Sequence, residues 1–173
     1  FGKLITDALE KKKKPKTIIR SPDTKNKFEN LFRKELLGKV RGFGKNKDLF
    51  EDFPDDVKWY KAVIQKQELK KVKYINWGYW NELSNKTRQP YRAVKNIKAS
   101  DVGNKHYFGI LAEIEKGIKI PAMIFIAKNR KSRIVVLEGH ARLTAYFLNE
   151  KAIPKHIEII IGYPEKLAKW NLY

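Results

Sequence analysis

A glutamate, a histidine and an arginine surround one glycine in the segment IVVLEGHARLTAYFLN. The apolar run before Glu138 is typical of a buried strand, and the run after Arg142 is typical of a buried helix. Gly139 lies at the junction, where the lack of a Cβ allows a sharp turn and the close approach of a ligand. The first N–H groups of a helix lack helical partners and lie at the positive end of its dipole. The spacing therefore predicts an anion site, with phosphate as the expected guest.

The side chains at this turn suit the chemistry of phosphoryl groups. His140 and Arg142 fall in the first helical turn, and an arginine offers a planar fork that matches phosphate oxygens. Glu138 ends the strand, and a carboxylate beside phosphate is favourable when it binds a metal ion, accepts a substrate proton or pairs with Arg142. We expect phosphate to bind at Gly139, His140 and Arg142. We expect Glu138 to be catalytic or to bind Mg²⁺.

A structural interpretation of the same residues stays open. Glu138 would then cap the helix, and His140 would be an ordinary surface histidine. Arg142 would be half of a structural salt bridge. The grouping of all three around a glycine favours the anion site.

The stretch EGHARLTAY resembles the glycine-centred phosphate motif of the ParB/sulfiredoxin superfamily, in which a strand, a G-x-x-R turn and a helix hold nucleotide phosphates. Gly139 and Arg142 match all branches. His140 matches the free-serine kinase branch, in which a second histidine stands at Ala141 and an aspartate at Glu138. ParB partition proteins have a Glu-Arg pair where His140 and Ala141 stand. Sulfiredoxin has a cysteine at the place of His140, and because this chain has no cysteine that reductase chemistry is excluded.

The resemblance covers about the last half of the chain, from GIKIPAMIFIA onward, and implies further site residues upstream. Families of this shape place an acidic residue and an arginine-bearing loop across the cleft from the phosphate turn. Glu68 is similar in placement to the catalytic glutamate of the kinase branch. Thr87 and Arg88, in TRQPYR, resemble the arginine loop and would bind phosphate. The alternatives are that Glu68 is a surface acid and that Arg88 and Arg92 only cover a loop.

The elements that must position these residues predict a compact α/β or α+β domain at residues 57–173. Hydrophobic periodicity predicts strands at 59–64, 122–127, 133–138 and 156–162. It predicts helices at 80–83, after Gly139 and from Pro164, and a further helix with apolar residues at Phe108, Leu111 and Ile114 that stops near Gly117. Residues 85–97 are expected to form a polar loop. Strands that alternate with helices favour this class. The resemblance implies a ParB/sulfiredoxin-like mixed sheet with flanking helices.

Residues 1–56 are predicted to form a basic, partly flexible extension. A lysine run closed by Pro15 disfavours regular structure. Apolar residues then recur at helical spacing from Phe28 to Leu36, and Gly38 suits the end of a short amphipathic helix. The stretch GKVRGFGKNK has the glycines and lysines of a phosphate loop, but it lacks the complete GxxxxGK[ST] spacing, and loop punctuation explains it as well.

The charge of the chain attracts anions. Lys+Arg number 38 against 19 Asp+Glu, which gives a formal net charge of +19. Nucleic acid, nucleotides, acidic proteins and anionic lipid all fit this charge, as does a solvated surface with no partner. No run reaches the length of a membrane span, so we expect a cytoplasmic protein with no membrane association.

The other candidate ligand residues are weaker. His106 and His156 lack partners at metal-ligand spacing and are expected to be surface or packing residues. Trp77, Tyr79 and Trp80 could stack on a base, although such a cluster is also typical of a core.

Three functional hypotheses follow. The first is a nucleotide-phosphate-binding ParB/sulfiredoxin-like domain that uses Mg²⁺ with ATP, ADP or CTP, and that transfers a phosphoryl group or hydrolyses the nucleotide. The second is a nucleic-acid-binding module whose basic surface contacts DNA or RNA. A nuclease is included in this hypothesis. The third is a protein-interaction domain whose phosphate site is inactive. The sequence leaves the oligomeric state, the acceptor and the preferred nucleobase open.

Overall fold

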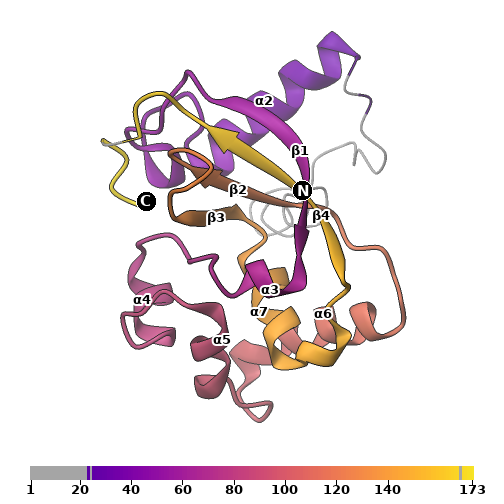
Figure 1. Ribbon diagram of the computed structural model, residues 1–173. Helices are drawn as coiled ribbons and strands as arrows, with labels where there is room; N and C mark the ends of the chain where they lie inside the picture. The colour runs from indigo at the N-terminus through magenta and orange to yellow at the C-terminus, as the bar shows by residue number, and fades with distance from the viewer. Residues whose placement is uncertain (1–22, 24, 168) are drawn as a thin grey trace. The chain divides into compact units, whose positions relative to one another are not determined.

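The computed structural model describes residue 23, residues 25–167 and residues 169–173 (Figure 1). The chain divides into two compact units, Phe1–Phe53 and Pro54–Tyr173. The lysine run for which flexibility was expected lies outside the described residues.

The first unit contains helix α2 (Lys27–Arg41) and the short 3-10 helix η1 (Asp48–Phe50). The Asn26 side chain caps α2 by accepting hydrogen bonds from the N–H groups of its first turn. The predicted end at Gly38 is wrong, because the helix continues to Arg41 and is capped by Gly42, which adopts the left-handed conformation with φ of 79°. Gly38 is instead a buried helical residue packed close to the carbonyl of Phe43. GKVRGFGKNK therefore begins within α2 and is not a continuous loop.

The second unit is built on a four-stranded mixed sheet in the order β1-β4-β2-β3. Its strands are β1 (Lys58–Gln65), β2 (Met123–Ala127), β3 (Ile134–Glu138) and β4 (His156–Tyr163). β1 pairs antiparallel with β4, β4 pairs parallel with β2, and β2 pairs antiparallel with β3. All four strands lie where the sequence pattern predicts them, and the α/β class is confirmed.

The helices of this unit are α3 (Lys66–Leu69), α4 (Gly78–Leu83), α5 (Pro90–Ala93), η2 (Val94–Asn96), η3 (Val102–Asn104), α6 (Lys105–Glu115), α7 (His140–Leu148) and η4 (Glu150–Ala152). α7 contacts β2 of the sheet and the helices α5 and α6 (Figure 1). The expected polar loop at 85–97 in fact contains α5 and η2. Pro90 starts α5 because its fixed φ suits the first helical position, and it is buried there.

The terminal helix predicted from Pro164 is wrong for the described residues of that segment, which form bends and turns. Its backbone groups bond to another part of the chain: the N–H of Asn76 donates to the Leu172 carbonyl at 2.8 Å. Leu167 and Trp170 are buried. Tertiary hydrogen bonds therefore replace the helical ones that the local pattern favours.

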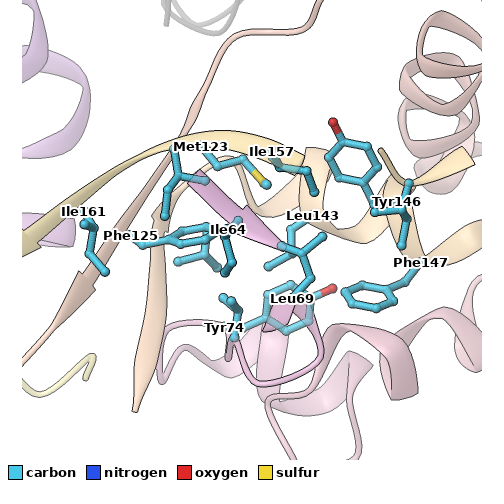
Figure 2. Close-up of a cluster of buried hydrophobic side chains, with 14 of the residues drawn as sticks. Ile64, Leu69, Tyr74, Met123, Phe125, Leu143, Tyr146, Phe147, Ile157 and Ile161 are labelled. Carbon is cyan, nitrogen blue, oxygen red and sulfur yellow. The ribbon is translucent and has the colours of Figure 1, made fainter. Parts of the chain in front are cut away.

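The core lies between the sheet and α7. Alternate residues of β4, Ile157, Ile159 and Ile161, are buried, as the twofold period of a strand requires. Leu143 of α7 and Tyr74, which follows α3, pack in the same cluster (Figure 2). No helix among the described residues is both long and apolar enough to cross a bilayer.

Candidate functional site at the start of α7

The turn between β3 and α7 is built on a glycine that no other residue can replace without strain. Gly139 has φ of 101° and ψ of 22°, in the left-handed region. A Cβ at this position would lie 2.8 Å from Cγ of Met123 and 3.2 Å from Nη2 of Arg142. The prediction that Gly139 lies at the strand-to-helix junction is confirmed. The atoms closest to the position of a Cβ there belong to the side chains of Met123 and Arg142.

Arg142 is a buried residue whose guanidinium binds the backbone before β2. Its Nη1 donates to the carbonyls of Pro121 and Ala122, the latter at 2.9 Å. Its Nη2 lies 3.5 Å from Oε1 of Glu138. Burial lowers the pKa of the guanidinium, and the Glu138 carboxylate opposes that shift. The salt bridge that the sequence allowed for is therefore present.

Glu138 is the last residue of β3, and its side chain is 11% exposed. Its 3.5 Å separation from Arg142 is longer than the roughly 2.7–2.9 Å of a strong charge-assisted hydrogen bond. Across the described residues, no three His, Asp or Glu side chains are grouped so that they could hold a metal ion. A magnesium ion at Glu138 would therefore take its other ligands from phosphate and water, which is common for this ion.

His140 begins α7 and belongs to a stack of three rings. Its imidazole lies nearly parallel to Trp80, with centroids 5.0 Å apart and planes at 13°, and Tyr74 lies 6.2 Å away at 21°. The Tyr74 hydroxyl shares a 2.6 Å hydrogen bond with Oγ1 of Thr144, and Thr144 donates to the His140 carbonyl at 2.8 Å. Burial raises the pKa of the Tyr74 phenol above its ordinary value. His140 is thus a packed side chain, half-buried against aromatic rings.

No motif in the sequence marks Tyr74 or Thr144 as a residue of the site. The position of Thr144 four residues after His140, on the same helix face, was the available signal for one of them. Nothing local marks Tyr74, because its partners come from later in the chain.

The structure places Glu68 at the start of α3, where it is exposed. Its Oε2 accepts a 2.9 Å hydrogen bond from the N–H of Gln65, and the two residues form a capping box. Thr87 donates from its hydroxyl to the Ser84 carbonyl at 2.7 Å. Both polar groups thus have local structural partners, and no hydrogen bond joins either residue to the start of α7.

Arg88 holds the C-terminal segment in place. Its Nε donates to the carbonyl of Tyr74 at 2.8 Å, and its Nη1 and Nη2 donate to the carbonyls of Tyr173 and Leu172 at 2.9 and 3.3 Å. Burial, with a further contribution from the charge of Arg133, lowers the pKa of Arg88 to about 10. Tyr74 contacts Arg88 through its carbonyl and His140 through its ring. It therefore links the predicted arginine loop to the predicted phosphate turn.

The remaining aromatic and histidine candidates divide by exposure. Trp77 and Tyr79 are 48% and 46% exposed, whereas Trp80 stacks within the cluster described above. His106 and His156 are both exposed. His106 lies 2.8 Å from the Gly103 carbonyl through Nδ1, which fits the expected surface role.

The start of α7 therefore combines first-turn amides, a fixed guanidinium, a buried carboxylate and an aromatic wall. Such a set can hold an oxyanion at the amides and Nη2, and a cation at the carboxylate. Comparison of the chain with models of known protein families, with curated proteins and with solved structures found no match.

Proposed function

We propose that the turn at residues 138–142 binds the phosphate groups of a nucleotide together with Mg²⁺. One observation carries this proposal: the buried nine-residue helix α7 follows an N-cap glycine, and a buried guanidinium is fixed beside its first turn. The Pro121 and Ala122 carbonyls hold Nη1 of Arg142, so the fork has a defined direction. An anion at that point gains both the helix dipole and a positive charge that is poorly solvated.

Nη2 of Arg142 is the group that would bind phosphate. It lies over the Gly139 turn, since a Cβ there would be 3.2 Å away, and its partner Glu138 is at 3.5 Å. A phosphate oxygen that lies closer to Nη2 than the Glu138 carboxylate does would form a stronger hydrogen bond with the guanidinium. The phosphate would then lie next to the Glu138 carboxylate, and the two negative charges would repel each other.

A magnesium ion held by Glu138 would neutralise the carboxylate and so relieve that repulsion. We therefore propose that Glu138 is the protein's magnesium ligand at this site. In a transfer or hydrolysis reaction, the same carboxylate would be the group that accepts a proton from the attacking hydroxyl or water. Glu68, Thr87 and Arg88 are left out of the proposed site, because their polar atoms bind the backbone elsewhere.

The aromatic wall gives this site a second feature of nucleotide recognition. His140 and Trp80 are both partly exposed, and flat rings of this kind pack against bases. Trp80 also provides the readout, since a ligand beside its ring would change the indole fluorescence.

The test is a titration with ATP, ADP and CTP, with and without Mg²⁺, followed by tryptophan fluorescence and calorimetry. Wild type should bind at least one of them more tightly with magnesium, by about tenfold or roughly 1.4 kcal/mol. The isosteric Glu138→Gln variant should bind equally with and without the metal, because its amide does not repel phosphate and is a weak magnesium ligand.

Glu158→Gln is the matched control, because Glu158 is an exposed β4 residue whose only described ion pair is with Lys119. This variant should retain the wild-type response to magnesium. If no nucleotide binds wild type at millimolar concentration, or if the magnesium effect is the same in Glu138→Gln, the proposal is wrong.

A further inference from the structure

We infer that the turn between β2 and β3, residues 128–133, binds the phosphate backbone of a nucleic acid. This basic turn has the sequence KNRKSR and is distinct from the start of α7. It carries four cationic side chains and no acidic one. All four, Lys128, Arg130, Lys131 and Arg133, are exposed.

Hydrogen bonds within the basic turn hold its backbone in one conformation. The N–H of Asn129 donates to Oγ of Ser132 at 2.9 Å, and Oγ of Ser132 donates to the Asn129 carbonyl at 2.8 Å. The N–H of Lys131 donates to Oδ1 of Asn129, also at 2.9 Å. Because the backbone is already ordered, binding through these cations costs mainly side-chain entropy.

The C-terminal segment supports the basic turn from outside the hairpin. The Tyr173 hydroxyl donates to the Arg133 carbonyl at 2.5 Å, and the Lys128 N–H donates back to that hydroxyl at 3.4 Å. The Arg133 guanidinium lies over the Tyr173 ring, 4.8 Å from its centroid. This contact orients one cation, and no carboxylate among the described residues pairs with it.

The charges of the basic turn are not neutralised within the described part of the chain. Lys58, Lys70 and Lys119 each pair with a carboxylate, but none of the four turn cations does. A further basic residue follows this hairpin, since the backbone of Lys73 forms a parallel bridge with Val135 of β3. Like charges gathered on one ordered surface repel each other, and a polyanion removes that repulsion.

The composition of the basic turn favours nucleic acid over the other polyanions. The turn has no apolar side chain that could enter a bilayer or form the centre of a protein interface. Arginine and lysine are the groups that bind nucleic-acid phosphates, and a two-stranded ribbon fits the major groove of duplex DNA. The proposal requires contacts to phosphate only, so it predicts affinity with little sequence preference.

The test measures binding of the full chain to a labelled DNA duplex by fluorescence anisotropy over a range of salt concentrations. The variant is Arg130→Ala with Lys131→Ala, and the control is Lys95→Ala with Lys98→Ala, which removes the same charge from exposed residues elsewhere. The turn variant should weaken binding by about tenfold or more at 0.1 M salt and reduce the salt slope by about 1.8, since each phosphate contact contributes about 0.9. The control should change affinity by less than about threefold.

Three results would overturn the inference. First, the turn variant and the control variant could weaken DNA binding equally, which would mean that net charge alone binds DNA. Second, the wild-type protein could bind neither duplex DNA nor duplex RNA at 50 mM salt. Third, the turn variant could lose binding to anionic vesicles and keep its binding to nucleic acid. Thermal melting of each variant checks that the fold is retained, and Glu138→Gln should leave nucleic-acid binding unchanged, which separates this inference from the nucleotide proposal.

Discussion

Arg142 and Glu138 form a buried ion pair across the Gly139 turn, with Nη2 3.5 Å from Oε1 and side chains that are 8% and 11% exposed. The same guanidinium binds the carbonyls of Pro121 and Ala122. Arg142 therefore joins the end of β3, the start of α7 and the entry to β2. This arginine therefore contributes to the stability of the fold, independently of any ligand.

Replacing Arg142 by methionine should lower the free energy of unfolding by about 3 kcal/mol, because the buried Glu138 carboxylate loses the Arg142 guanidinium and two carbonyls lose a donor. Adding Glu138→Gln to that variant should recover part of the loss, since a neutral amide costs less to bury than a carboxylate. Urea unfolding of the two single variants and the double variant measures the coupling. Arg130→Met, on the exposed turn, is the control and should unfold like wild type. A stable Arg142→Met protein would contradict the assigned role.

Gly139→Ala should destabilise the protein by about 2 kcal/mol or more. The left-handed backbone alone costs an alanine about 1–2 kcal/mol, and its Cβ would meet Cγ of Met123 at 2.8 Å. Gly109→Ala is the matched control: Gly109 lies in α6 with open space around it, so the change should stabilise by roughly 0.5–1 kcal/mol. Equal melting temperatures for the two variants would show that the Gly139 turn has another conformation.

Tyr74→Phe tests the buried phenol. At pH 7 the loss of the hydrogen bond with Thr144 should cost about 1 kcal/mol. Burial raises the pKa of Tyr74 in the folded protein, so its contribution is fully present below the unfolded value of about 10 and is lost as the pH rises above it. Wild type should therefore lose stability faster than the variant between pH 9 and 11. Denaturant titrations across that range would refute the assignment if the two curves stayed parallel.

Arg88→Ala should release the C-terminal segment. Three carbonyls, those of Tyr74, Leu172 and Tyr173, would lose their charged donor, at a cost of about 2 kcal/mol. Hydrogen exchange at residues 169–173 should become faster than in wild type. Arg92→Ala, which removes a guanidinium placed over the Tyr91 ring, should leave that exchange unchanged. Unaltered protection in Arg88→Ala would mean that Asn76 and the buried Trp170 hold the segment without it.

Local patterns predicted the strands well and the helix ends poorly. Alternation of buried isoleucines identifies β4, and the β-branched run before Glu138 identifies β3, because side-chain direction in a strand depends only on the neighbours. The end of α2 was misplaced because Gly38 and Gly42 are both plausible stops, and only the packed backbone shows which one turns left-handed. The segment after Pro164 is irregular because its carbonyls are bound by Arg88, far away in the sequence.

By itself the sequence determined the α/β class and the strand-to-helix junction at Gly139, since both depend on residues a few positions apart. It offered the pairing of Glu138 with Arg142 only as one of several alternatives. Only the tertiary structure decided where the long side chains end. Arg142 reaches Pro121 and Ala122, 21 and 20 residues earlier, and Arg88 reaches residues 84 and 85 positions later. The physical reason is that hydrophobic periodicity in the sequence shows which face of a helix or strand is buried. The partner of a buried guanidinium depends instead on the sheet order β1-β4-β2-β3, because that order determines which backbone carbonyls lie within its reach.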